Sequence, residues 1–138
     1  MALKPNEQEL LDRVQSGLGI GGTWQPSTTG ATIDVHDPAT GEVIKQIADA
    51  TVEDAVRALD AAVAAQDSWA ATPTRERSNI LRRAFDLLME RKEEFALLMA
   101  MEMGKPIAEA RGEVNYGGEF LRWFSEEAVR VRGDYRPN

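Results

Sequence analysis

The feature of this sequence that most constrains its fold is a change in the spacing of apolar residues at Thr51. From Val52 almost to the end of the chain, apolar residues recur every three or four positions, which is the period of an amphipathic helix. Before Thr51, residues 32–37 alternate between apolar and polar, which is the period of a strand. The sequence therefore predicts a mostly α-helical chain with a β-hairpin near its N-terminus.

The boundaries of these elements follow from turn and capping residues. The hairpin is predicted over residues 32–48, because residues 37–41 read Asp-Pro-Ala-Thr-Gly, a sequence that favours a tight turn. Residues 20–24 and the Ser-, Thr- and Gly-rich stretch after them are predicted to form a short strand followed by a loop, and Gly19-Ile20-Gly21-Gly22 is predicted to be a turn. Pro, Gly and Thr at helix ends bound the predicted helices, which cover about residues 6–16, 52–70, 73–103 and 106–132.

Composition excludes several classes of function. The chain has no Cys, which rules out a disulfide framework, a zinc–thiolate or iron–sulfur site and a thiol nucleophile within it. Its one His, His36, is too few for a multi-histidine metal site. With 16 basic and 23 acidic residues the formal charge is −7, so no nucleic acid partner is expected. No apolar run is long enough to span a membrane and no signal peptide is recognisable, so we expect a soluble cytoplasmic protein.

Two glycine-containing segments fall short of phosphate-binding motifs. Gly104-Lys105 lacks both the Gly five positions earlier and the following Ser or Thr that a P-loop needs. The segment Gly19-Ile20-Gly21-Gly22 is not followed by the helix that a dinucleotide fingerprint requires. Carboxylates of the last helix have Arg neighbours at helical spacing and predict a solvated, ion-paired face, and they are Glu109, Glu113, Glu126 and Glu127. The residues alone therefore predict no complete active site.

A pair of glycines, Gly117-Gly118, interrupts the last predicted helix at a cost of roughly 2 kcal/mol of helix stability relative to Ala. Such a pair indicates a close backbone approach or a bend. Aromatic residues surround the pair and give the helix a second apolar face, which is more typical of a buried core than of a ligand site. These residues are Tyr116, Phe120, Trp123 and Phe124.

Several segments, in their order along the chain, resemble the N-terminal part of the aldehyde dehydrogenase superfamily. They read IGGTW at 20–24, DPATGEVI at 37–44, WAAT at 69–72, RERSNILRR at 75–83 and EMGKPIAEA at 102–110. The last helix, with GEVNY at 112–116 and FLRWFSEEA at 120–128, is most similar to the succinate-semialdehyde dehydrogenase branch. The resemblance covers nearly all of the chain from about Leu18, and implies that residues 1–138 are the N-terminal part of an NAD(P)-binding domain. The implied fold is α/β, with this fragment contributing only part of a three-layer sandwich.

The resemblance implies that the full-length enzyme oxidises succinate semialdehyde to succinate with NAD or NADP, as a homo-oligomer. The family's catalytic Cys, general base and cofactor-binding residues lie beyond position 138, so we expect no catalytic and no cofactor-binding residue here. The chain alone is expected to be inactive. Two alternatives remain open at this point: an aldehyde dehydrogenase for another aldehyde, and a stand-alone helical protein-interaction module without catalysis.

Two smaller sites are implied by position within the family. The backbone carbonyls of Val35 and His36, with the carboxylate of Glu102, would bind a structural monovalent cation; family members usually have Asp in place of this Glu. Gly117, Phe120 and Phe124 would line part of the substrate tunnel. The family also packs these helices on a sheet whose strands come later, so we expect the isolated chain to expose apolar faces and to aggregate or unfold without cooperativity.

Overall fold

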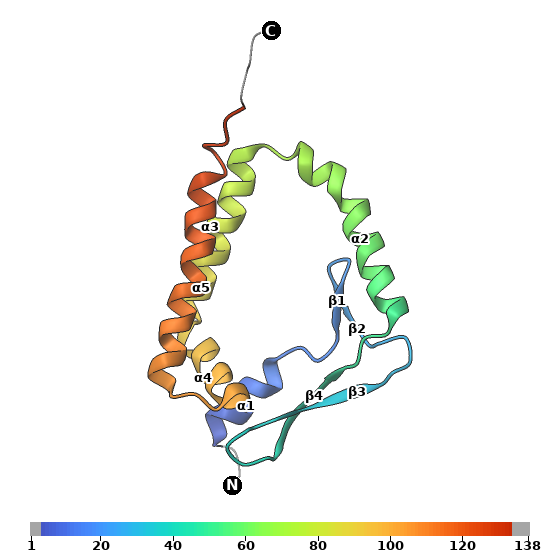
Figure 1. Ribbon diagram of the computed structural model, residues 1–138, viewed down its shortest axis with the longest axis vertical. Helices are drawn as coiled ribbons and strands as arrows, with labels where there is room; N and C mark the ends of the chain where they lie inside the picture. The colour runs from blue at the N-terminus through green and yellow to red at the C-terminus, as the bar shows by residue number, and fades with distance from the viewer. Residues whose placement is uncertain (1–3, 134–138) are drawn as a thin grey trace.

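The computed structural model describes residues 4–133 and is mostly helical (Figure 1). Figure 1 shows an open frame, with one long helix on one side, a packed group of helices on the other, and two hairpins with a short helix near the lower ends. The helices are α1 (Pro5–Arg13), α2 (Val52–Ala71), α3 (Thr74–Glu90), α4 (Lys92–Met103) and α5 (Ile107–Glu127).

The strands form two separate antiparallel hairpins. In the first, Leu18 of one strand pairs with Gln25 of the other, and the connecting Gly21 and Gly22 have φ of 60° and 82°. A type I′ turn needs positive φ at both central residues, which explains the glycine pair. The strands are β1 (Leu18–Ile20), β2 (Thr23–Gln25), β3 (Thr32–His36) and β4 (Val43–Ala48).

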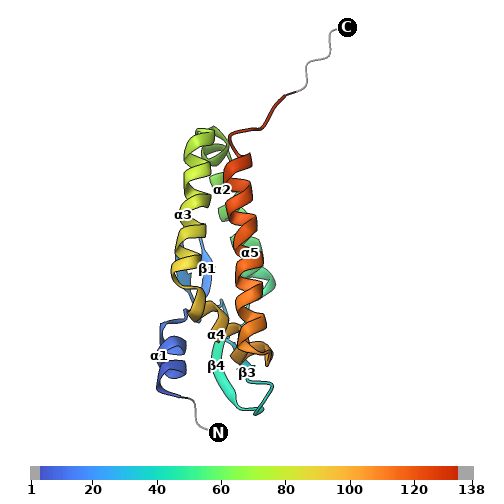
Figure 2. The same cartoon turned by 90° about the vertical axis from the view of Figure 1, so that its left-hand side faces the viewer.

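The packed part of the molecule is formed by α3, α4 and α5, with α3 and α5 side by side over most of their length (Figure 2). Ala96 of α4 and Ala110 and Val114 of α5 are buried at its centre, and partly buried side chains of α3 and α4 pack around them. A Cβ added at Gly118 would lie 2.8 Å from Cε of Met89, so α5 approaches α3 closely at this point. The glycine pair thus serves a close approach, and α5 continues through it.

The N-terminal helix is attached to both the helical group and the second hairpin. Leu10 and Leu11 are buried, and Arg13 forms a 2.8 Å ion pair with Glu94 of α4. Nζ of Lys45 in β4 donates a 2.5 Å hydrogen bond to the carbonyl oxygen of Leu11. These contacts hold the hairpin β3–β4 beside α1 and α4.

Four predicted segments differ from the structure. The single helix over 73–103 is two helices, α3 and α4, separated at Arg91, whose φ of −105° and ψ of 16° are not helical. The predicted helix over 6–16 ends at Arg13; Gly17 does not cap it but lies against β2, where a Cβ would come within 2.8 Å of the carbonyl oxygen of Gln25. Residues 20–24, predicted as a strand and a loop, belong to the hairpin β1–β2.

The last predicted helix, over 106–132, is shorter in the structure and ends at Glu127. No helix within residues 4–133 is long and apolar enough to cross a membrane.

Candidate functional site

The candidate site is the aromatic face of α5, which consists of Tyr116, Phe120, Trp123 and Phe124. Their spacing of four, three and one residues places them on one side of the helix. With Glu119 they line a hollow of about 350 Å³, and their exposed fractions lie between 50% and 70%. The rings of Tyr116 and Phe120 meet edge to face, with centroids 5.2 Å apart. The interpretation of this cluster as a buried core is therefore wrong for residues 4–133, because the rings face open space.

The two glycines of α5 face different surroundings. Gly118 lies against α3, whereas a Cβ added at Gly117 would meet nothing within 4 Å. Gly117 precedes Phe120 and Phe124 by three and seven positions, so the three predicted tunnel residues share one side of α5. The absence of a side chain at Gly117 leaves space next to the aromatic face. The structure thus brings together the residues expected to line a tunnel, although the tunnel itself stays a prediction.

The side chains of the aromatic face are suited to binding an apolar ligand and include no nucleophile. Its one carboxylate, Glu119, accepts hydrogen bonds from Nε and Nη2 of Arg122 at 2.8 Å and 2.5 Å. These hydrogen bonds raise the pKa of the Arg122 guanidinium above its ordinary value. The Glu119 carboxylate is thus engaged with Arg122. The aromatic rings can contact the apolar part of a ligand while excluding water.

The predicted cation ligands come from two segments that lie close together, the hairpin β3–β4 and the end of α4. Val35 and His36 are at the end of β3, and the register of β3 and β4 is irregular between them. Glu102 is exposed near the end of α4, whose cap residue Gly104 lies so close to the hairpin turn that a Cβ there would be 2.8 Å from Cγ of Pro38. No group of three or more His, Cys, Asp or Glu within residues 4–133 could hold a metal. A site built from two carbonyls and one carboxylate is a different arrangement and stays a prediction.

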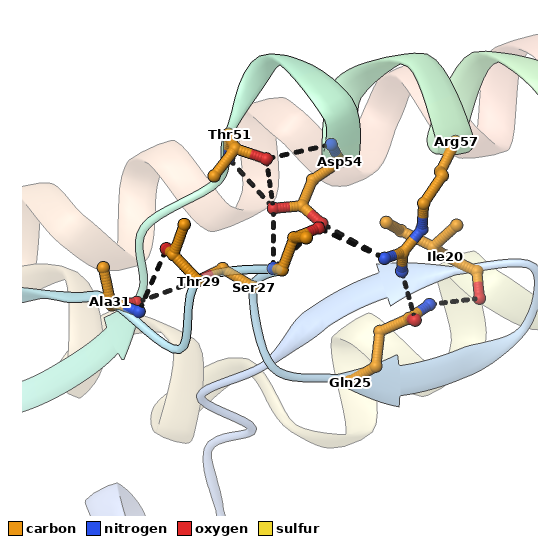
Figure 3. A network of polar contacts seen from close by, with 9 residues as sticks. Ile20, Gln25, Ser27, Thr29, Ala31, Thr51, Asp54 and Arg57 are labelled. Carbon is orange, nitrogen blue, oxygen red and sulfur yellow. Dashed lines mark hydrogen bonds and ion pairs between the residues drawn. The ribbon is translucent and has the colours of Figure 1, made fainter.

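Asp54 forms a buried polar network that sequence analysis did not anticipate (Figure 3). Its carboxylate is 1% exposed and accepts hydrogen bonds from the hydroxyl of Thr28 at 2.5 Å and from the hydroxyl and amide of Thr51, both at 2.9 Å. The amide of Thr28 also donates to it, and Arg57 lies 3.4 Å away. These bonds, the Thr28 hydroxyl first, hold the pKa of Asp54 far below its ordinary value. The network joins the loop after β2 to the start of α2.

The signal for half of this network was present in the sequence. Thr51 and Asp54 have the spacing of a capping box, and the structure has both of its hydrogen bonds. Thr28, which is 26 positions away from Asp54, has no local signal that connects it to α2. The network is fully satisfied and distant in the chain from the aromatic face, so we regard it as structural.

The predicted pairing with Arg at helical spacing is confirmed for Glu126, which lies 3.8 Å from Arg122, and for Glu127, which lies 2.8 Å from Arg130. Glu113 is also ion-paired, but with Lys105, which precedes the helix. The single His also has a hydrogen-bond partner, since Nδ1 of His36 lies 3.2 Å from the carbonyl oxygen of Gly41. None of these groups forms an acid–base pair with a nucleophile in the part of the chain that the structure describes.

Known proteins share both the sequence and the fold. The sequence model of the aldehyde dehydrogenase family matches residues 24–138. The succinate-semialdehyde dehydrogenase of Paenarthrobacter nicotinovorans is 67% identical over 93 residues, which cover 67% of this chain and 21% of that protein. The glutarate-semialdehyde dehydrogenase of Pseudomonas aeruginosa is 45% identical over 118 residues, which cover 86% of this chain and 24% of that protein.

Solved structures give the same result. A succinate-semialdehyde dehydrogenase from Burkholderia pseudomallei is 42% identical with a TM-score of 0.86, over 98% of this chain and 27% of that one. An aldehyde dehydrogenase from Brucella melitensis biovar abortus is 41% identical with a TM-score of 0.88, over 100% of this chain and 28% of that one. The chain thus spans about a quarter of the length of these proteins, and the expected α/β family fold, present here in part, is confirmed. The chain belongs to the aldehyde dehydrogenase family.

Proposed function

We propose that this chain is the N-terminal part of an NAD(P)-dependent aldehyde dehydrogenase that oxidises succinate semialdehyde to succinate. The observation that carries the proposal is the 67% identity to a succinate-semialdehyde dehydrogenase. Glutarate semialdehyde is the second candidate substrate, since a glutarate-semialdehyde dehydrogenase is 45% identical over a longer stretch. The two substrates are both semialdehydes of dicarboxylic acids and differ by one methylene group.

We expect the dinucleotide to be bound mainly by residues beyond position 138. When bound, NAD or NADP accepts the hydride from the aldehyde. The only glycine-rich segment within residues 4–133, at 19–22, forms the turn of the hairpin β1–β2, and no helix follows it to receive a pyrophosphate. The contribution of residues 4–133 to the reaction is therefore binding of the substrate.

That contribution is a wall of the substrate passage. Phe120 and Phe124 offer ring surface to the methylene groups of a semialdehyde, and Gly117 leaves room beside them. Aromatic rings of this kind exclude water from the path to the reacting carbon. The hollow of about 350 Å³ has one carboxylate, paired with Arg122, so the carboxylate of the substrate must be bound by residues outside this face.

A cation site at Val35, His36 and Glu102 belongs to the same proposal. The contact between Gly104 and Pro38 brings the end of α4 to the hairpin that carries the two carbonyls, which supports it. A bound monovalent cation there would fasten the hairpin to α4. We also propose a homo-oligomeric, cytoplasmic enzyme, in line with the resemblance.

The test is a substrate panel with the complete enzyme that carries this sequence. We expect the highest kcat/KM with succinate semialdehyde, a lower value with glutarate semialdehyde, and at least a tenfold lower value with butyraldehyde, which has the same carbon chain without the carboxylate. Each aldehyde is assayed with NAD and with NADP. A kcat/KM for butyraldehyde equal to that for both semialdehydes would overturn the assignment, and residues 1–138 alone should show no turnover.

A further inference from the structure

A second hollow lies where the start of α3 meets the end of α5, and Figure 2 shows these two helix ends side by side. Its volume of about 390 Å³ is within the range of small-molecule sites. None of its lining residues belongs to the aromatic face of α5. We refer to it as the arginine hollow, because three arginines line it although the chain as a whole has a formal charge of −7. These arginines are Arg75, Arg82 and Arg130.

A buried hydroxyl group in the arginine hollow has no partner. Ser78 of α3 is only 6% exposed, and its side chain forms no hydrogen bond within residues 4–133. Ser125, which faces it from α5 and is 3% exposed, donates a 2.6 Å hydrogen bond to the carbonyl oxygen of Arg122. Buried polar side chains are almost always paired in native proteins. The unpaired hydroxyl of Ser78 therefore indicates a missing hydrogen-bond partner inside the hollow.

The three guanidinium groups keep most of their donors available. Arg75 forms no ion pair and no side-chain hydrogen bond among the residues that the structure describes. Arg82 uses Nε to pair with Asp86 at 3.2 Å, and Arg130 uses Nη1 to pair with Glu127 at 2.8 Å. Both carboxylates lie outside the lining of the hollow. Since a guanidinium has five N–H donors, each arginine can still bind two oxygens of an anion.

Two further features of the hollow restrict the ligand. Helix α3 has 17 residues and begins after Pro73 without a side-chain cap, so its first turn adds positive partial charge beside Arg75. Among the lining residues, Glu126 is the one carboxylate, and it lies 3.8 Å from Arg122. An anionic group suits the arginine side of the hollow, whereas a hydroxyl group can donate to Glu126.

We propose that the arginine hollow is a binding site for a small phosphate monoester that carries a hydroxyl group. A phosphate monoester has nearly two negative charges at pH 7 and three acceptor oxygens, which match three arginines and the hydroxyl of Ser78. A monocarboxylate would offset fewer of these charges and has only two oxygens. The inference goes beyond the proposed function, and it does not depend on which aldehyde is the substrate.

The experiment is a calorimetric titration of the complete enzyme that carries this sequence with glycerol 3-phosphate, at constant ionic strength. We expect Arg75→Gln to raise the dissociation constant at least about tenfold, because it removes a cation that has no other partner. Ser78→Ala should raise it by about threefold to tenfold. Arg83→Gln is the matched control, because Arg83 is exposed on the same helix outside the hollow, and it should leave the dissociation constant within about twofold.

Three results would overturn the proposal. The first is no binding of glycerol 3-phosphate at millimolar concentrations, and the second is equal affinity of Arg75→Gln and Arg83→Gln. The third is succinate binding that depends on Arg75 and is as tight as glycerol 3-phosphate binding, since the ligand would then be a carboxylate. Thermal midpoints without ligand check that all three variants keep the fold. Because binding is measured without aldehyde, a failed substrate panel leaves this test intact.

Discussion

Helices α2 and α5 are almost equally long, with 20 and 21 residues, but their apolar faces have different surroundings. Helix α5 buries Ala110, Val114 and Gly118 against α3 and α4 and presents its aromatic rings to a hollow. The one buried residue of α2 is a carboxylate, Asp54, and its aliphatic stripe is open. Apolar periodicity therefore reveals that a helix has an apolar face, whereas what covers the face depends on segments far away or on other polypeptide.

The chemistry of the two open faces also differs. Short branched side chains on α2 form a low ridge suited to permanent packing. Large rings on α5 enclose space beside Gly117, which suits a ligand that enters and leaves. This difference supports the proposal that the aromatic face of α5 lines the substrate path.

The largest expected effect is on the cooperativity of unfolding. The central core is small, and the aliphatic side chains of α2 (Val52, Val56, Leu59 and Val63) are exposed. The isolated 138-residue chain should therefore melt broadly, bind a hydrophobic dye and associate. Joined to the remaining polypeptide, the same residues should melt in one sharp transition. Circular dichroism at increasing temperature and dye fluorescence measure both states. A sharp two-state melt of the isolated monomer would favour a stand-alone interaction module.

Asp54→Ala should lower the stability of the protein strongly. It leaves the amides of Thr28 and Thr51 without their acceptor and frees the start of α2 from the loop after β2. In the complete enzyme, whose larger size dilutes the effect of one substitution, we expect the thermal midpoint to fall by about 3 °C. Asp60→Ala, which removes an exposed carboxylate of the same helix, is the control and should change the midpoint by less than about 1 °C.

The same carboxylate makes stability depend on pH in a defined direction. The pKa of Asp54 lies far below the value of about 3.9 in an unfolded chain. Its contribution is therefore fully present above about pH 4 and is lost as the pH falls toward the native pKa. Midpoints measured between pH 6 and pH 2 should fall more steeply for the unmodified protein than for Asp54→Asn, and parallel curves would contradict this account.

Gly118→Val and Gly117→Val form a matched pair that separates the two sides of α5. Both substitutions raise helix propensity by the same amount, because Val is a better helix former than Gly. Only the side chain at position 118 enters occupied space, since its Cβ would lie 2.8 Å from Met89 and 3.5 Å from Leu88. We expect Gly118→Val to be less stable than Gly117→Val by about 1–3 kcal/mol in urea unfolding of the complete enzyme. Equal stability would mean that α3 and α5 do not touch there.

Much of the fold could be predicted because its signals are local. The switch of period at Thr51, the turn at Pro38 and the capping residues were sufficient for the helical content and for the hairpin β3–β4. The break at Arg91 had no such signal, since Met, Glu, Arg and Lys around it all favour helix. Packing of α4 against α5 and α1 decides the break, and that information is not in the neighbouring sequence.

The candidate site shows the same division. Gly117, Phe120 and Phe124 were named from family position, and the structure places all three on one side of α5. The sequence could not show that the aromatic rings are exposed. The pairing of Thr28 with Asp54 joins positions that are 26 residues apart, so no local pattern could reveal it. Local rules find faces and caps, and contacts between distant segments need coordinates.

Phe120→Ala in the complete enzyme should reduce kcat/KM for succinate semialdehyde by about threefold to tenfold. The substitution removes ring surface from the hollow and admits water, which weakens contact with the methylene groups of the substrate. Steady-state kinetics measure the effect, and Val129→Ala is the control. Val129 is exposed after the end of α5, next to residues of α3, and does not line this hollow. Unchanged kcat and KM would remove Phe120 from the substrate path.

The smallest expected effect completes the comparison of α2 with α5. In the isolated chain, Leu59→Asp should leave the helical circular dichroism signal nearly unchanged, because Leu59 is already in water. Val114→Asp, which places the same charge in the buried core of α5, should abolish the helical signal of the packed group. If instead Leu59→Asp unfolds the isolated chain, the aliphatic face of α2 around Leu59 is already covered by the chain itself. The aliphatic face of α2 would then not be an open surface, and the contrast drawn here between α2 and α5 would be wrong.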